Sequence, residues 1–132
     1  MKHFTLLIVA LLAISTSLAA QTSEDFDAKM REYKLVDIQT IEGGEDIIVE
    51  LKYSTTDNFV GVDMYSDLET AYLERAFAAR VVRAQQLLQQ RHPEYTLLIY
   101  DAARPISVQR AMRKAVEGTE LESFVADGTR GG

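Results

Sequence analysis

The sequence predicts an α+β fold, with a small mixed or antiparallel sheet and two main helices. Two stretches in the first half alternate apolar and polar residues with the period of two that is typical of half-buried strands. Two later stretches carry apolar side chains at helical spacing, and a short apolar run between them predicts one more strand. Strands that come first and helices that are segregated after them favour α+β architecture.

The first twenty residues form a region of their own, which we interpret as a secretory signal peptide. Lys2 and His3 give it a charged start, and residues 4–14 form an apolar run broken by one threonine. The run is too short to cross a bilayer, which favours a signal peptide over the alternative, an N-terminal membrane anchor. Ser17, Leu18 and Ala19 fit the small-x-small cleavage pattern, which predicts a cut after Ala19 or Ala20. We therefore expect the protein in the periplasm.

The composition excludes several classes of protein for the remaining segment, residues 21–132. The chain has 132 residues and a formal net charge of −6, which argues against a nucleic acid as partner. It has no cysteine, so as an exported protein it is neither a disulfide scaffold nor a lipoprotein. No repeat or linker divides residues 21–132, so we expect one domain with a modest core.

The first half of this domain predicts two strands. Residues 21–29 are polar and predict a loose lead-in, and residues 34–41 alternate as a half-buried strand. Residues 42–46 contain two glycines and predict a turn. Residues 47–53 alternate again, and we expect the two strands to be a hairpin or direct neighbours. The apolar face of the second strand holds Ile47, Val49, Leu51 and Tyr53.

A long loop and a long helix follow. Residues 54–67 lack a clear period, but their aromatic and apolar content speaks against disorder. Ser66 and Glu69 have the spacing of a capping box, which predicts a helix from there to about Arg91. His92 and the proline after it end the helix. The expected core-facing stripe is Leu73, Phe77, Val81, Ala84 and Leu88.

The last predicted elements are a buried strand at residues 95–100 and a second helix. This helix opens at Pro105 or Ser107 and stops at Gly118, and residues 119–132 predict a loop. The late strand must join the sheet of the first two strands, which leaves an edge to be covered, so we expect an incomplete domain. The buried helix face holds Val108, Met112, Ala115 and Val116.

Two residues at strand ends are candidates for function. Arg104 follows the apolar run and precedes Pro105, so a rigid backbone supports a fork of donors that suits a carboxylate or a developing oxyanion. Local sequence alone nevertheless favours a structural salt bridge from Arg104 to Asp101. Tyr53 is by itself best interpreted as a core tyrosine, with pocket lining as the functional alternative.

Other local patterns carry little chemistry. Asp57 and Asn58 are typical turn formers, and Gly61 fits a turn. His3 and His92 have no metal-ligand spacing, and the chain has no nucleophile elbow and no phosphate-binding loop. Local motifs alone therefore indicate an exported α+β domain without a stated activity.

Two blocks taken together resemble a known family. Residues 51–61 (LKYSTTDNFVG) and, about forty residues later, residues 100–105 (YDAARP) are similar to motifs of the D-alanyl-D-alanine dipeptidases. These are zinc peptidases of the vancomycin-resistance type, related to D,D-carboxypeptidases and L,D-endopeptidases. The resemblance covers about residues 35–132. Its K-Y-x-T-x-D-N-F-x-G block is fairly specific to the dipeptidases, whereas D-x-x-R-P is shared more widely.

The resemblance implies an activity and roles for single residues. The family hydrolyses the cell-wall dipeptide D-alanyl-D-alanine with a zinc ion that polarises the scissile carbonyl and a glutamate that deprotonates the zinc-bound water. By this resemblance Arg104 would stabilise the tetrahedral oxyanion and Tyr53 would line the substrate pocket. Asp57, Asn58 and Phe59 would belong to the loop beside the pocket, with a structural role.

The chain departs from the family pattern at its C-terminal end. In the family, the segment that matches residues 124–127 leads into an S-x-H-x-x-G-x-x-x-D block with two zinc ligands, and a later E-x-W-H block supplies the catalytic glutamate and the third ligand. Neither block occurs before Gly132. We therefore expect an N-terminal fragment of a zinc dipeptidase that holds no zinc and is inactive alone.

Two alternatives remain open at this point. One is a non-catalytic periplasmic module that holds a peptide carboxylate with Arg104 and Tyr53. The other is a parent enzyme that is a carboxypeptidase or endopeptidase acting on longer wall peptides.

Overall fold

The computed structural model describes residues 23–66 and 68–129, and these residues form a small mixed α+β domain. The described residues contain three helices, four strands of two residues each and three 3-10 turns. The helices are α2 (Ser23–Glu32), α3 (Arg75–Arg91) and α4 (Ile106–Val116). The strands are β1 (Val36–Asp37), β2 (Ile48–Val49), β3 (Tyr72–Leu73) and β4 (Leu98–Ile99). The 3-10 turns are η1 (Ile38–Thr40), η2 (Lys52–Ser54) and η3 (Glu120–Phe124).

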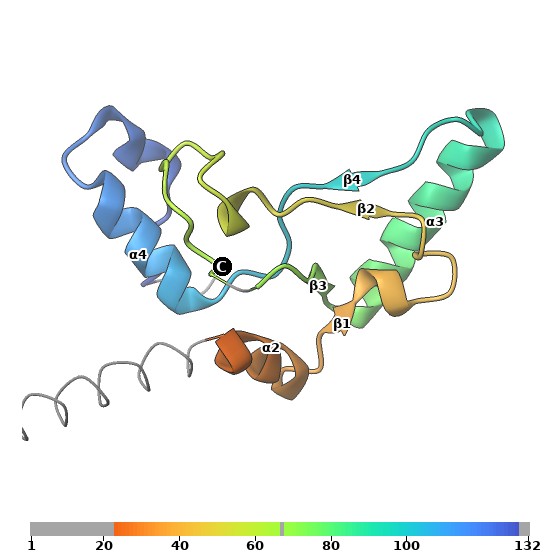
Figure 1. Cartoon of the computed structure of the whole chain (residues 1–132), viewed down its shortest axis with the longest axis horizontal. Helices are drawn as coiled ribbons and strands as arrows, with labels where there is room; N and C mark the ends of the chain where they lie inside the picture. Colours follow the sequence, from red (N-terminus) through yellow and green to blue (C-terminus); the bar gives the residue numbers. More distant parts are fainter. Residues whose placement is uncertain (1–22, 67, 130–132) are drawn as a thin grey trace, which may run out of the picture.

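The strands form two separate ladders, and the predicted hairpin of the first two strands is wrong. β1 pairs antiparallel with β3, and β2 pairs parallel with β4. Each early strand therefore takes a partner from later in the chain. Asp37 shortens β1, because its carboxylate accepts the Gln39 N–H at 2.9 Å and caps η1. In Figure 1 the two ladders lie between α3 and α4, which stand at opposite ends of the molecule.

The lead-in before β1 is a helix rather than the loose segment that the sequence predicts. α2 ends in a Schellman motif, in which the Leu35 N–H donates to the Met30 carbonyl at 3.0 Å. The Lys34 N–H donates to the Arg31 carbonyl at 2.9 Å, and Lys34 has a φ of 59°. Lys34 thus occupies the left-handed position that usually holds glycine, and the predicted strand cannot begin there.

The predicted capping box at Ser66 and Glu69 is also wrong. Ser66 has a φ of 52° and lies in a turn, where its N–H donates to the Asp63 carboxylate at 2.8 Å. The extended backbone of β3 separates this turn from α3. The helix begins at Arg75, and Glu74 is its N-cap, with a carboxylate that accepts two first-turn N–H groups at 2.8 and 2.9 Å.

The long helix turns a different face to the core from the one predicted. Its buried residues are Ala78, Val82 and Gln85, whereas Phe77 in the predicted stripe is 47% exposed and Ala84 is also exposed. Of the other predicted positions, Val81 and Leu88 are partly buried, and Leu73 lies in β3. On α4 the prediction holds for Val108, Met112 and Val116, which are buried, but Ala115 is exposed.

Gln85 explains why α3 buries this face, because its side chain connects the helix to the segment that leads into β4. Its side chain is 1% exposed. The amide nitrogen donates to the Thr96 hydroxyl at 2.7 Å, and the amide oxygen accepts the Leu97 N–H at 2.8 Å. The Thr96 hydroxyl donates in turn to the Asp46 carbonyl at 2.8 Å. One buried amide thus joins α3, the start of β4 and the turn before β2.

The late strand is shorter and less covered than predicted. Only Leu98–Ile99 is strand, and Leu98 and Tyr100 are 42% and 50% exposed. β4 pairs with β2 on one edge, and the side chains of Leu97 and Ile99 pack against the core. The predicted loop after α4 contains η3, which packs against that helix.

Replacing Gln85 tests this buried contact. We expect Gln85→Ala to lower the free energy of unfolding by about 1–3 kcal/mol, because the part-buried Leu97 N–H loses its acceptor and the Thr96 hydroxyl loses its donor. Urea denaturation measures the change. Gln90→Ala, at an exposed position of the same helix, is the matched control and should stay within about 0.5 kcal/mol of the parent. Equal stabilities of the two variants would contradict the role of Gln85.

The cap at Glu74 predicts a pH dependence of stability. The N–H groups of Ala76 and Phe77 lower the pKa of the Glu74 carboxyl from its ordinary value of 4.5. A lowered folded-state pKa gives stability above the unfolded-state pKa, and this stability is lost as the pH falls through the folded-state pKa. Glu74→Ala should therefore lower the Tm at neutral pH, and the difference should vanish in acid. Glu69→Ala is the control and should leave the Tm unchanged at both pH values.

Candidate functional site

The candidate site lies around Arg104, which stands five residues after the end of β4. The Ala103 N–H donates to the Tyr72 carbonyl at 2.9 Å, so the segment between β4 and Arg104 is tied to β3. The Arg104 side chain is 23% exposed. Its guanidinium carbon stands 4.7 Å from the centre of the Tyr53 ring, a cation–π contact. The structure therefore brings together the two residues that the sequence analysis put first.

A buried tyrosine orients the arginine. Tyr65 has no exposed surface, and its hydroxyl donates to Asp101 Oδ1 at 2.7 Å. The same hydroxyl accepts the Arg104 Nε–H at 3.1 Å. Arg104 Nη2 also forms the predicted ion pair with Asp101 Oδ2. The three groups therefore close a ring of hydrogen bonds on one edge of the guanidinium.

The protonation of this ring is fixed by its surroundings. Burial, together with the hydrogen bond to Asp101, raises the pKa of the Tyr65 phenol far above its usual range. Burial alone would lower the pKa of Arg104, but the hydrogen bonds to Asp101 and Tyr65 raise it. The phenol therefore stays neutral and the guanidinium stays a cation at ordinary pH.

Part of the donor fork of Arg104 stays available. Arginine carries five N–H groups. Nε–H is used by Tyr65, one Nη2–H by Asp101 and one Nη1–H by the Gln109 amide oxygen at 2.6 Å. Among the described residues, one N–H on each terminal nitrogen has no protein acceptor. Two such donors match a carboxylate or an oxyanion.

Arg104 lines a pocket of about 270 Å³. Tyr53 and Phe59 form one side, and their rings meet edge to face with centroids 6.0 Å apart. The segment 124–126, which follows α4, forms the opposite rim, and Phe124 is 80% exposed there. The pocket therefore presents one cationic side chain, Arg104, among apolar and aromatic side chains. The full lining is Tyr53, Phe59, Arg104, Gln109, Met112, Phe124, Val125 and Ala126.

Asn58 holds the loop beside the pocket but does not line the pocket. Its amide nitrogen donates to the carbonyls of Lys52, Thr55 and Val62 at 2.7–3.2 Å. Its amide oxygen accepts the N–H groups of Val60 and Gly61, both at 2.9 Å. The side chain thus replaces the backbone hydrogen bonds that an irregular loop lacks.

Asp57 is likewise outside the pocket. Its carboxylate is exposed and pairs with Lys52 Nζ at 2.8 Å. The hydrogen bond from Lys52 lowers the pKa of Asp57. Of the three loop residues named from the sequence, only Phe59 reaches the pocket.

Several residues of the site were not predicted from the sequence. Tyr65 lies in the stretch without period, which gives no signal for a buried tyrosine. Gln109 stands five residues after Arg104 in α4, and its place on the same helix face as Met112 is the only hint. The segment 124–126 was predicted as part of a loop without a role.

The described residues do not fit a catalytic zinc ion. Within residues 23–66 and 68–129, no three His, Cys, Asp or Glu side chains gather where they could hold a metal. His92 follows the end of α3, where it is exposed, and its ring lies tilted against that of Tyr95, with centroids 5.4 Å apart. In the same part of the chain, no helix is long and apolar enough to cross a membrane. The predicted signal peptide lies outside the described residues.

Comparisons with family models, with curated proteins and with solved structures find no match for this chain. The function is therefore inferred from the pocket and from the two sequence blocks.

Removing the Tyr65 hydroxyl tests the hydrogen-bonded ring. Tyr65→Phe keeps the buried ring but leaves Asp101 and Arg104 without their shared partner, so we expect the free energy of unfolding to fall by about 1–3 kcal/mol. Tyr95→Phe removes the hydroxyl of a tyrosine that is 56% exposed and serves as control. Urea denaturation of both variants measures the difference, and an unchanged Tyr65→Phe protein would show that the ring contributes nothing.

Proposed function

We propose that this chain supplies the substrate-binding part of a zinc-dependent peptidase that hydrolyses D-alanyl-D-alanine. The observation that carries the proposal is the fork of Arg104, which is held in a small pocket with one N–H free on each terminal nitrogen. In the proposed reaction these donors stabilise the oxyanion of the tetrahedral intermediate, while Tyr53 and Phe59 line the substrate pocket.

The rigidity of Arg104 supports this role. An oxyanion donor is effective when it is already oriented before charge develops, because no reorganisation is then needed in the transition state. All three nitrogens of the Arg104 guanidinium donate hydrogen bonds, and the guanidinium also lies over the ring of Tyr53. Since Asp101 balances its charge, Arg104 favours ligands that bond directly to the free N–H groups over ligands attracted from a distance.

The size and walls of the pocket support a small substrate. A volume of about 270 Å³ lies below that of most sites for drug-sized ligands. Met112 and Val125 supply apolar walls that suit methyl side chains. These properties agree with a dipeptide of alanine, and the resemblance of residues 51–61 and 100–105 to the dipeptidases is the reason to choose this one.

The proposal assigns no metal chemistry to the described residues. They contain no group of side chains that could hold zinc, and the whole chain has only two histidines. The zinc ligands and the glutamate base would have to come from further polypeptide, as in the family that the two blocks resemble. The signal-peptide interpretation of residues 1–20 places this activity in the periplasm, in cell-wall metabolism.

A second candidate function is a peptide-binding module without catalysis. The same two N–H groups of Arg104 would make a bidentate contact with a peptide carboxylate. Such binding needs only the fork of Arg104 and the ring of Tyr53, which the structure brings into contact. A carboxypeptidase or endopeptidase acting on longer wall peptides is the third, and the exposed rim at Phe124 leaves room for a longer chain.

Arg104 is the residue to test. In an enzyme completed with the coding sequence downstream of residue 132, we expect Arg104→Ala to lower zinc-dependent release of D-alanine by about 10²–10³-fold, as for the loss of one oxyanion donor. Arg83→Ala, at an exposed position of α3, is the control and should leave turnover unchanged. Unchanged turnover in Arg104→Ala would leave Arg104 with its structural ion pair alone.

The completed enzyme and the present chain together also distinguish the three candidate functions. A downstream sequence without the zinc-ligand blocks, together with binding of D-alanyl-D-alanine by the chain itself, would favour the binding module. Faster cleavage of longer wall peptides than of the free dipeptide would favour the carboxypeptidase or endopeptidase.

A further inference from the structure

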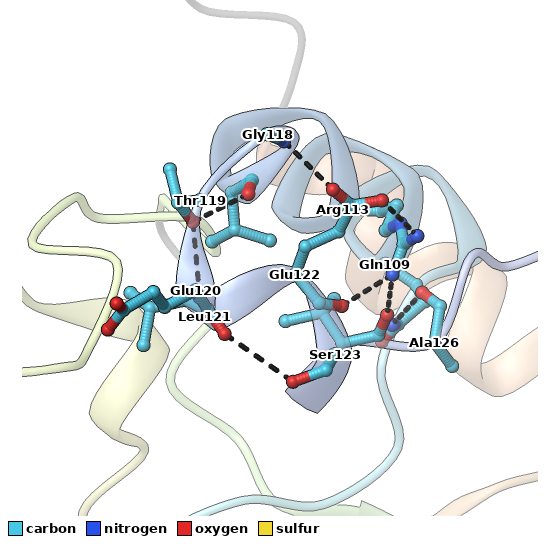
Figure 2. Close-up of polar contacts among 11 residues, drawn as sticks. Gln109, Arg113, Gly118, Thr119, Glu120, Leu121, Glu122, Ser123 and Ala126 are labelled. Atoms are coloured by element: carbon cyan, nitrogen blue, oxygen red, sulfur yellow. Dashed lines mark hydrogen bonds and ion pairs between the residues drawn. The ribbon is translucent and has the colours of Figure 1, made fainter.

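Arg113 of α4 binds the segment after that helix, residues 119–126, which includes the pocket rim. Arg113 donates to the Glu122 and Val125 carbonyls at 2.5 and 2.7 Å, and it pairs with Glu122 Oε1 at 2.5 Å. The other carboxylate oxygen of Glu122 accepts the Gly118 N–H at 2.9 Å. Figure 2 shows Arg113 reaching from α4 into the turn formed by this segment. The path of residues 119–126 is therefore fixed relative to α4.

Gln109 connects this clamped segment to Arg104. It lies one helical turn before Arg113, on the same face of α4. Its amide nitrogen donates to the Ala126 carbonyl at 2.8 Å, as Figure 2 shows, and its amide oxygen accepts the Arg104 Nη1–H at 2.6 Å. A flipped amide would put donor against donor at Arg104 and acceptor against acceptor at Ala126. The two neighbours thus fix which way the amide points.

We propose that Gln109 is a positioning residue for Arg104, which transmits the placement of segment 119–126 to the guanidinium. Its relevance to substrate rests on the proposed function, in which Arg104 contacts the reacting group. The positioning itself is a property of the free protein.

The geometry explains why this one amide matters. Tyr65 and Asp101 hold Nε and Nη2, which lie on one edge of the guanidinium. Gln109 is the partner of Nη1. The guanidinium is planar, so the directions of its N–H groups follow the orientation of that plane. Without Gln109, Nη1 has no protein partner among the described residues, and the plane can tilt about the edge that Tyr65 and Asp101 hold. Gln109 therefore fixes the tilt of the guanidinium plane, and with it the direction of the free N–H groups of Arg104.

The direct test observes the Arg104 side chain by ¹⁵N NMR in the full chain. In Gln109→Met, which keeps the side-chain length but removes both hydrogen bonds, rotation about Cζ–Nη1 should become about tenfold faster or more, as for the loss of a hydrogen bond to a charged group. The Arg104 Nε–H signal should stay protected by Tyr65. Gln90→Met, at an exposed position of α3, is the matched control and should match the parent.

A second variant separates the two hydrogen bonds. Gln109→Glu keeps an acceptor for Arg104 but cannot donate to the Ala126 carbonyl. We expect slow Nη1 rotation to persist in this variant, while the backbone signals of residues 125–127 shift. If Gln109→Met does not fold, Gln109→Glu still decides the matter, because the connection requires those backbone signals to move. Parent-like Nη1 rotation in a folded Gln109→Met, or parent-like signals of residues 125–127 in Gln109→Glu, would overturn the proposal.

A binding measurement distinguishes this inference from the proposed function. Titration with D-alanyl-D-alanine should show an affinity about tenfold lower in Gln109→Met than in the parent. If the parent and Arg104→Ala respond alike to the dipeptide, the proposed function fails, but the rotation of Nη1 still decides whether Gln109 positions Arg104.

Discussion

The buried hydroxyl of Tyr65 is the contact on which the rest of the site depends. It lies between Asp101 and Arg104 and bonds to both, at 2.7 and 3.1 Å. Tyr65 comes from the irregular loop after β2, whereas its two partners follow β4. One phenol thus ties the loop that carries Phe59 to the segment that carries Arg104. Burial raises the pKa of this phenol, so its hydroxyl keeps its proton in the ordinary pH range.

Arg104 is held by two sets of partners, Tyr65 and Asp101 on one edge of its guanidinium and Gln109 at Nη1. Tyr65, which is fully buried, and Asp101, which follows β4, fix one edge of the guanidinium. Gln109 belongs to α4 and joins the arginine to the clamped segment that forms the pocket rim. The pocket therefore has one wall from the loop after β2, which Arg104 contacts directly, and another from residues 124–126, to which Gln109 connects Arg104. This arrangement suits a group that must recognise a small anionic centre in a fixed orientation.

Local features were predictable from the sequence, and long-range ones were not. The Asp101–Arg104 pair and the buried face of α4 at Val108 and Met112 follow from spacings of three and four residues. The strand pairing does not, because β1 and β2 each take a partner from later in the chain. The start of α3 was missed because glutamate caps it, where the Ser66 pattern offered a more usual cap. Tyr65 gave no signal, since its burial depends on residues 36 positions away.

These long-range contacts have a consequence for the order in which the chain folds. Tyr65 and Asp101 are 36 residues apart, and Thr96 and Asp46 are 50 residues apart. Loops of this length must close before either contact can stabilise the fold, and the entropy lost in closing them slows folding. The helices can form early from local contacts, but Arg104 has no fixed orientation until both loops have closed. The pocket and the native fold therefore form in the same late step.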